Sequence, residues 1–160
     1  MSHRGPDFLF EAVTNSLEAG AREITIEYSD YSQFLDITVT DDGKGFSGNV
    51  FASGFSTKGE GRGKGLYLLK QRADSVDIKR EKSLTKLSYR IKKEENDYIS
   101  EVLPFIFSYV SDKASIDFIF HSKELNESVC SSDLIKEFGS LNSVKALSTL
   151  KKRFSVFYLK

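Results

Sequence analysis

The sequence contains a single cysteine, Cys130, and two histidines, His3 and His121. One cysteine cannot form an internal disulfide, nor can it supply the cysteine clusters that hold zinc or iron–sulfur centres. We expect His3 to be a terminal surface residue and His121 a strand-end residue. Hydrophobic runs of membrane-spanning length are missing, and residues 1–6 lack the apolar segment of a signal peptide. The sequence therefore predicts a soluble, cytoplasmic protein without a membrane partner.

An excess of charge of either sign is also missing. The chain has 23 Lys and Arg residues and 23 Asp and Glu residues, so its formal net charge at pH 7 is zero. This balance argues against non-specific binding to nucleic acid, which depends on basic side chains that neutralise phosphates, but it leaves a local basic patch open. The 160 residues are enough for one compact domain or two small ones.

The spacing of apolar residues in the first part of the chain predicts a helix, two strands, a long glycine-rich loop, a second helix and two further strands. The two helices are expected over residues 7–19 and 66–74, and the loop over residues 46–62. The four strands are expected over residues 24–28, 34–40, 76–80 and 87–92.

The polar run at residues 92–97 is the predicted domain boundary, which divides the chain into domains 1–93 and 97–160. Ser132 and either Asn142 or Ser143 are the expected helix N-caps in the second part. The elements expected there are a helix over 98–110, a hairpin of strands 116–121 and 127–130, helices over 133–138 and 144–154, and a short strand over 155–159.

The segment DDGKGFSGNV at residues 41–50 contains G-K-G-F-S-G, which matches the dinucleotide-binding fingerprint G-x-G-x-x-G and follows a predicted strand. In a Rossmann fold the third glycine opens an amphipathic helix, whereas the residues that follow here are rich in Gly and Ser and have no helical period. Asp41 and Asp42, directly before the turn, would also repel a pyrophosphate. We therefore set the Rossmann interpretation aside.

Three motifs carry residues that could do chemistry. Glu11, Asn15 and Glu18 share one face of the first helix. Another face carries the apolar residues Leu9, Val13 and Leu17. The other two motifs are DDGKG at residues 41–45 and GEGRGKG at residues 59–65. Taken singly, the three are compatible with a solvated helix face, a tight turn and a flexible loop.

Together and in this order, the motifs resemble the N, G1 and G2 boxes of the GHKL ATP-binding superfamily, which includes DNA gyrase, heat-shock chaperone ATPases, histidine kinases and MutL. EAVTNSLEAGA (residues 11–21) resembles the N box of MutL, and GFSTKGEGRGKGLYLLKQ (residues 54–71) resembles the lid and G2 box of citrate/malate-type sensor kinases. The resemblance covers residues 7–92. It implies the Bergerat fold, an α+β two-layer sandwich with one mixed sheet and helices on one face. We expect residues 97–160 to form a small α+β appendage that makes no nucleotide contact.

The resemblance also implies roles for individual residues. Asp41 matches the aspartate that accepts a hydrogen bond from the adenine amino group, and Gly43 and Gly45 let the backbone approach the base. Asn15 matches the residue that offers a side-chain oxygen to Mg²⁺, the expected cofactor beside ATP. Glu11, one helical turn earlier, is placed to orient or deprotonate an attacking water.

The remaining implied ATP contacts lie in the lid and at the start of the second helix. Backbone N–H groups at a helix start bind anions, and nearby cationic side chains add charge to phosphates. Thr85 matches a threonine that lies near the adenine-binding aspartate. We expect residues 46–63 to be the most mobile internal segment and to become ordered on nucleotide binding. The other implied nucleotide-binding residues are Thr57, Lys58, Gly61, Arg62, Gly63, Lys64, Gly65 and Leu66.

Two parts of related proteins are missing from this sequence. It has no H-E-x-x-P phosphoacceptor motif ahead of the N box, so we do not expect a complete histidine kinase. Residues 97–160 are too few for the domain with which gyrase and MutL send a lysine to the γ-phosphate. These residues instead resemble the tail of small stand-alone ATP-binding proteins encoded near iron-only hydrogenase genes in anaerobic bacteria. That resemblance implies a regulatory or maturation-linked role with an undefined protein partner.

Three functions follow as hypotheses. The first is an ATP-binding regulatory protein with slow Mg-dependent ATPase or partner-directed kinase activity, which the presence of Glu11 favours. The second is a non-hydrolysing, ATP-gated protein-binding module that could serve a hydrogenase or redox system; the short lid and the missing lysine favour it. The third, a MutL-like DNA-processing factor, is disfavoured by the balanced charge and by the missing second domain.

Overall fold

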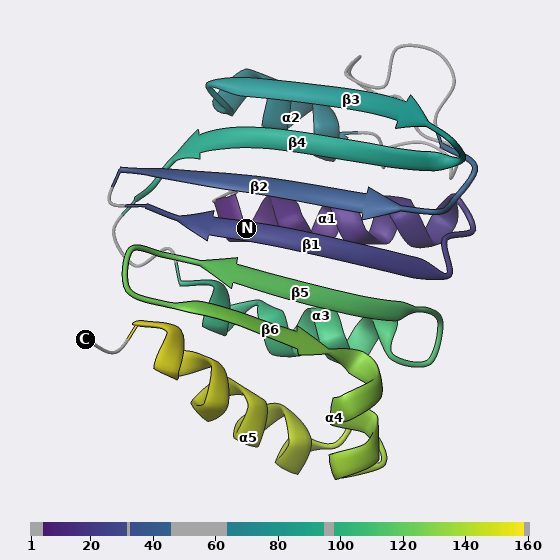
Figure 1. Ribbon diagram of the computed structural model, residues 1–160, viewed down its shortest axis with the longest axis vertical. Coiled ribbons are helices and arrows are strands. Elements are labelled where there is room, and N and C mark those ends of the chain that lie inside the picture. Colours follow the sequence, from purple (N-terminus) through teal and green to yellow (C-terminus); the bar gives the residue numbers. More distant parts are fainter. Residues whose placement is uncertain (1–4, 32, 46–63, 95–97, 159–160) are drawn as a thin grey trace.

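The structure is a computed structural model that describes residues 5–31, 33–45, 64–94 and 98–158. Six strands form one sheet in the order β3-β4-β2-β1-β5-β6 (Figure 1). The elements along the chain are α1 (Gly5–Glu18), β1 (Glu23–Asp30), β2 (Phe34–Asp41), α2 (Lys64–Arg72), β3 (Ser75–Glu81), β4 (Leu84–Lys92), the 3₁₀-helix η1 (Ile99–Glu101), α3 (Leu103–Val110), β5 (Ser115–His121), β6 (Asn126–Cys130), α4 (Ser131–Phe138), α5 (Val144–Phe154) and the 3₁₀-helix η2 (Ser155–Tyr158).

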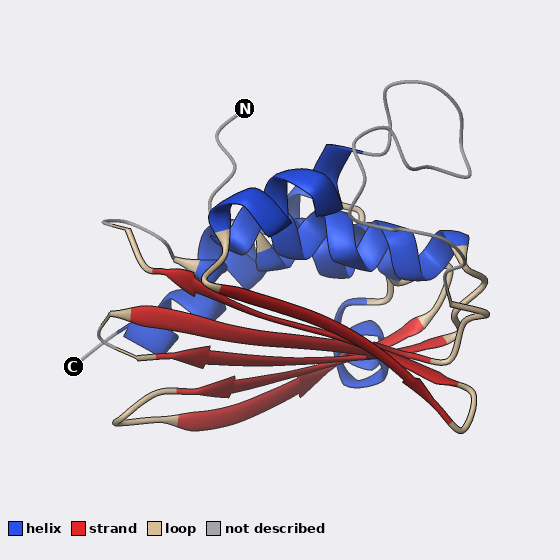
Figure 2. Ribbon diagram, turned by 90° about the horizontal axis from the view of Figure 1, so that it is seen from above, coloured by secondary structure: helices blue, strands red, loops and turns tan. Residues whose placement is uncertain are grey.

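The two central strands, β1 and β2, each bury every second side chain. This alternation gives the sheet one apolar face, which must be covered to be removed from water. The helices α1 and α2 lie over that face, and among the described residues up to Glu94 no helix lies on the opposite face (Figure 2). The α+β two-layer sandwich with helices on one face is therefore confirmed.

The helix α1 packs on the sheet through most of the residues that its sequence predicts. Leu9 and Val13 are fully buried, but Leu17 is only half-buried, and Ser16 is buried one position earlier. Tyr89 of β4 anchors the start of the helix, because its hydroxyl group donates a hydrogen bond to the carbonyl oxygen of Gly5 at 3.1 Å. The first half of α1 is thus fixed by apolar packing, while its last turns carry polar groups toward the end of β2.

The sheet is mixed, but its parallel pair comes from beyond the predicted domain boundary. The ladders that join β1 to β2, β2 to β4 and β3 to β4 are all antiparallel. β5 pairs with β1 in parallel over Glu23–Ser29 and Ser115–His121. The buried side chains of β5 and α3 also join the same hydrophobic core as those of α1 and β1. The division into domains 1–93 and 97–160 stays a prediction about folding units, within a sheet that is continuous across the boundary.

The C-terminal helices pack around a cluster of aromatic rings at the β5–β6 side of the sheet. Phe157 stacks on Phe120 with a ring-centroid distance of 4.6 Å, and Phe154 packs against Phe107 of α3 at 5.8 Å. The expected strand over residues 155–159 is wrong, since residues 155–158 form η2. The 3₁₀-helix η2 places the ring of Phe157 against Phe120 of β5.

The expected N-caps have mixed outcomes. Ser143 caps α5, with its hydroxyl oxygen accepting a hydrogen bond from the Ala146 N–H at 3.0 Å. Ser132 is not a cap, because α4 begins one residue earlier, at Ser131. The Ser131 hydroxyl oxygen instead accepts from the backbone N–H of Ile116 at the start of β5.

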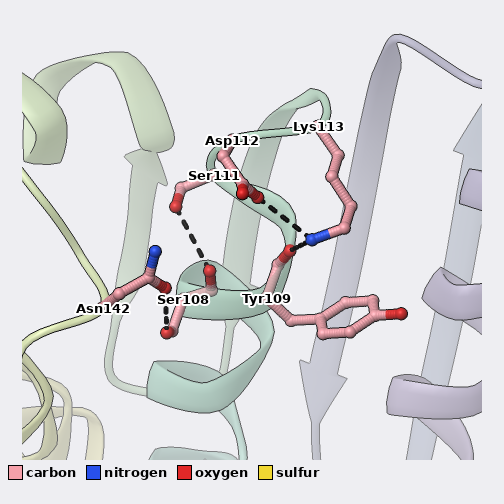
Figure 3. A network of polar contacts seen from close by, with 6 residues as sticks. All are labelled: Ser108, Tyr109, Ser111, Asp112, Lys113 and Asn142. Carbon is pink, nitrogen blue, oxygen red and sulfur yellow. Dashed lines mark hydrogen bonds and ion pairs between the residues drawn. The ribbon is translucent and has the colours of Figure 1, made fainter.

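A polar network closes the turn between α3 and β5 (Figure 3). The ammonium group of Lys113 donates to the carbonyl oxygen of Tyr109 at 2.9 Å and to Asp112 at 3.0 Å, and it lies 4.4 Å from the centre of the Tyr109 ring. Ser108 joins α3 to the segment before α5 through a 2.7 Å hydrogen bond to Asn142. These contacts end α3 and turn the chain into β5.

Within the described parts of the chain, no helix combines the length and apolar character that crossing a membrane requires.

Candidate nucleotide site

The motif DDGKG forms the end of β2 and the turn after it, against the last turn of α1. Asp41 is only 6% exposed, and both of its carboxylate oxygens accept a hydrogen bond. The hydroxyl group of Ser16 donates to Oδ2 at 2.7 Å, and the backbone N–H of Gly43 donates to Oδ1 at 2.8 Å. These donors fix the orientation of the carboxylate. Each oxygen has a further lone pair that can accept a second hydrogen bond.

Asp42, the next residue, is exposed and serves the backbone. Its Oδ1 accepts hydrogen bonds from the backbone N–H groups of Glu23 at 3.0 Å and Arg22 at 2.7 Å. These two hydrogen bonds, with that from Glu23 the larger effect, hold the pKa of Asp42 below its ordinary value. The two adjacent carboxylates therefore have different environments: Asp42 fixes the start of β1, and Asp41 faces the helix layer.

The two glycines of the turn are in crowded positions. A Cβ atom at Gly43 would lie 2.9 Å from the carbonyl oxygen of Ala19, the residue directly after α1. Gly45 has φ near +77°, which favours glycine, and a Cβ there would lie 2.7 Å from Nη1 of Arg80. The backbone N–H of Lys44 also donates to the Ala19 carbonyl at 2.9 Å. Close contact with Ala19 and Arg80 thus requires small residues here. The role of the glycines in making room for a base stays a prediction.

Thr85 lies directly opposite Asp41 in the β2–β4 ladder, so both side chains are on the helix-covered face of the sheet. Thr85 is 2% exposed. Its hydroxyl oxygen accepts a 2.6 Å hydrogen bond from Nη1 of Arg80 in β3, and the same nitrogen donates to the carbonyl oxygen of Gly43 at 2.8 Å. The structure thus brings Asp41, Thr85 and the glycine turn together.

Glu11 and Asn15, the residues expected to act on water and metal, are half-buried on α1, whereas Glu18 is exposed. Asn15 directly precedes Ser16, whose side chain holds Asp41, so the polar turns of α1 and the end of β2 share one region. Among the described residues, no group of three or more His, Cys, Asp or Glu side chains could hold a metal by itself. The side chains of Glu11 and Asn15 offer oxygen atoms, the ligand type that Mg²⁺ prefers, and Mg²⁺ commonly takes one or two protein oxygens and completes its shell with phosphate oxygens and water.

The residues expected to contact phosphates are only partly covered by the structure. Lys64, Gly65 and Leu66 form the first turn of α2, so the helix begins where an anion site at its N-terminus requires. The side chain of Leu66 is buried in the hydrophobic core, so its contact with a ligand would be through the backbone. Thr57, Lys58, Gly61, Arg62 and Gly63, and the lid at 46–63, lie outside the described residues.

Sequence reasoning missed two residues of this region, Ser16 and Arg80. Ser16 had a signal, because it is a small polar residue beside the buried stripe of α1, where an apolar residue would be expected. Arg80 had none, because its contacts depend on the register of β3 against β4 and on the position of the turn after β2.

Comparison with known proteins agrees with this geometry. The family model described as "Histidine kinase-, DNA gyrase B-, and HSP90-like ATPase" matches residues 7–95, which is more than half of the chain and includes every candidate site residue. A search of curated protein sequences found no match to this chain. The family match supports ATP binding.

Proposed function

Because the chain belongs to the family of histidine kinase-, DNA gyrase B- and HSP90-like ATPases, we propose that it is a regulatory protein that binds Mg-ATP between α1 and the end of β2 and either hydrolyses it slowly or transfers its γ-phosphate to a protein partner. The observation that carries this proposal is the buried carboxylate of Asp41, which has one hydrogen bond on each oxygen and a further lone pair on each. Such a carboxylate can accept a further hydrogen bond from a ligand. The amino group of adenine is such a donor.

Asp41 would read the base. Both of its present partners are neutral donors, so an N–H group of the base adds to the site without displacing an ion pair. A base without that N–H group would leave a buried acceptor unsatisfied, at a cost of about 1–3 kcal/mol. This cost would select adenine over bases that carry an oxygen at the same position.

Asn15 and Glu11 would divide metal binding and chemistry between them. The side-chain oxygen of Asn15 would hold Mg²⁺, whose chemistry when bound is to neutralise charge on the phosphates. Glu11 lies one helical turn away on the same side of α1 and is half-buried, so its carboxylate would orient or deprotonate a water molecule near the γ-phosphate. Lys64, Gly65 and the lid residues Thr57, Lys58, Gly61, Arg62 and Gly63 would hold the phosphates.

The partner and the place of action are part of the proposal. A cytoplasmic protein partner, rather than a membrane or nucleic acid, agrees with the balanced charge of the chain. The resemblance of residues 97–160 to proteins encoded near hydrogenase genes makes a redox system a reasonable place to look for that partner.

The test measures Mg-ATP binding by calorimetry and phosphate release with and without cell lysate. We expect Asn15→Ala to weaken binding of Mg-ATP and to leave binding of magnesium-free ATP nearly unchanged, because only a metal ligand is removed. We expect Glu11→Ala to bind ATP normally and to lower turnover by about 100-fold or more. Glu18→Ala, an exposed carboxylate on the same face in the last turn of α1, is the matched control and should change neither quantity.

Two outcomes would change the proposal. A wild-type protein that binds no adenine nucleotide would contradict it entirely. A wild-type protein that binds Mg-ATP but releases no phosphate under any condition would favour the ATP-gated binding module, in which bound nucleotide orders a surface for a partner.

A further inference from the structure

We propose that Arg80 determines which purine the site accepts, because it holds the hydroxyl group of Thr85 in the orientation of a hydrogen-bond donor. The ligand class that follows is a 6-aminopurine nucleotide with an unprotonated ring nitrogen N1, as in adenine. This inference rests on the proposed function, since it concerns the base at the same site.

One nitrogen of Arg80 connects the two halves of the site. Nη1 donates to the carbonyl oxygen of Gly43 at 2.8 Å and to the hydroxyl oxygen of Thr85 at 2.6 Å. A guanidinium Nη atom carries two hydrogens, so these contacts use both of them. The side chain of Arg80 is otherwise exposed, which places the guanidinium group at the edge of the site rather than in the core.

The direction of the bond to Thr85 is fixed by chemistry. Arginine has only donors and keeps its charge at any physiological pH, so Thr85 must be the acceptor. Its hydroxyl proton must then point away from Arg80. Within the described ranges, no residue accepts a hydrogen bond from this proton, although Thr85 is only 2% exposed. A buried donor without an acceptor costs free energy, and a ligand that supplies the acceptor recovers it.

The donor and the acceptor stand side by side. Thr85 and Asp41 are opposite each other in neighbouring strands and point to the same face of the sheet. The site therefore presents an acceptor, the Asp41 carboxylate, next to a donor, the Thr85 hydroxyl. Adenine presents the complementary pair, an amino group at C6 and the acceptor N1. Guanine and hypoxanthine present the opposite pair, an oxygen at C6 and an N1–H group, so both contacts fail.

Gly45 allows this arrangement. A Cβ atom at this position would lie 2.7 Å from Nη1 of Arg80 and 3.0 Å from the hydroxyl oxygen of Thr85. Any larger residue would therefore displace the guanidinium group from between the turn and β4. Glycine at position 45 thus leaves space for the guanidinium group of Arg80 and also permits the positive φ of the turn.

The experiment compares the binding of ATP and ITP, whose base is hypoxanthine, to the wild type and to Arg80→Met. Without the guanidinium donors the Thr85 hydroxyl can rotate and accept from N1–H, so we expect the ATP-to-ITP preference to fall about five- to tenfold, the worth of one hydrogen bond. Arg80→Lys keeps a cationic donor and should restore most of the preference. Arg90→Met is the matched control, because Arg90 pairs with Asp36 on the other face of the sheet, and it should leave the preference unchanged.

Thr85→Val adds a second test that does not depend on Arg80. It removes the hydroxyl group and should lower the same preference, and adding Arg80→Met to it should produce no further change. If Arg80→Met weakens ATP and ITP by the same factor, Arg80 only supports the turn and the inference is wrong. If the wild type binds neither nucleotide, the proposed function itself fails, which is a distinguishable result.

Discussion

Asp41 and Asp30 are two buried aspartates at opposite ends of the β1–β2 ladder, and their surroundings differ. Both are nearly inaccessible, with 6% and 7% of their surface exposed. Asp30 is paired with a cation, since the ammonium group of Lys93 lies 2.6 Å from its Oδ1. Asp41 has only the neutral donors Ser16 and Gly43, and it takes no ion pair from any residue in the described ranges.

The difference separates a carboxylate that is paired with a cation from one that is not, and the proposed function assigns the second to the ligand. Burial is the main cause that raises the pKa of Asp30, and the hydrogen bond and charge of Lys93 act against it. The ammonium group of Lys93 therefore compensates the negative charge of Asp30 within the protein. Asp30 also has one oxygen, Oδ2, that is buried without a hydrogen-bond partner, so unused acceptor capacity does not distinguish the two aspartates. What distinguishes Asp41 is that both of its oxygens are oriented by neutral donors and that no cation among the described residues pairs with it.

The largest effect that would test this comparison is on nucleotide affinity. Asp41→Asn places an amide N–H group where an acceptor is needed, and a hydrogen bond to a charged group is worth about 1.5–3 kcal/mol. We therefore expect ATP affinity to fall about 10- to 150-fold. Asp30→Asn, the matched change at the other end of the ladder, should leave the dissociation constant unchanged in calorimetry. Equal losses for the two variants would remove the distinction.

The second effect concerns stability. Lys93→Met removes the cation and leaves the Asp30 carboxylate, whose side chain is 4% exposed, without a charge partner. We expect the free energy of unfolding to fall by about 2 kcal/mol, less than the 3–5 kcal/mol typical of fully buried pairs because Lys93 itself reaches solvent. Urea denaturation measures this loss. The same variant should bind ATP normally, and a large loss of affinity would show that the two ends of the sheet are coupled.

A smaller effect is expected for Ser16→Ala. This change removes one of the two donors that orient Asp41, so we expect a loss of about 1 kcal/mol in stability and a loss of ATP affinity below about tenfold. Thr14→Ala, a change of similar size on the same helix, is the control, because its hydroxyl group bonds only to the helix backbone at Phe10. If Ser16→Ala binds ATP as tightly as the wild type, the Gly43 N–H group alone is sufficient to orient the Asp41 carboxylate.

The smallest effects are on the pH dependence of stability, and they have opposite signs at Asp30 and Asp42. The raised pKa of Asp30 means that its contribution is present at low pH and is lost as pH rises through its folded pKa. The lowered pKa of Asp42 means that its contribution is present above the unfolded value and is lost as pH falls through its folded pKa. Melting temperatures of Asp30→Asn and Asp42→Asn, relative to the wild type between about pH 3 and pH 7, should therefore diverge in opposite directions. Parallel shifts would contradict the assignment.

Much of the fold follows from local pattern, and the failures have physical causes. Strict alternation of apolar residues predicted β1 and β2, because each strand has one face in water and one in the core. Residues 155–158 misled the same reasoning. Their aromatic residues fit a strand by composition, but the packing of Phe157 on Phe120 decides their conformation, and no local pattern records that contact.

The site shows the same limit. The motifs singled out Asp41 and the glycine turn, and the family resemblance singled out Thr85. The structure brings the three together through one strand ladder and one turn. The contact of Arg80 with Thr85 depends on strand register, and the pairing of Asp30 with Lys93 joins residues from two strand ends. Both arise only when the sheet is assembled, so neither could be predicted from sequence spacing. The parallel pairing of β5 with β1 was missed for the same reason.

That pairing has a consequence for a chain emerging from the ribosome. β1 is complete at Asp30, but its parallel neighbour ends only at His121. Throughout the synthesis of the residues between them, Ile24, Ile26 and Tyr28 belong to an unpaired sheet edge that could join the edge of another nascent chain. In the folded protein β5 occupies this edge of β1, so a chain that ends before residue 115 would leave the edge open to other chains.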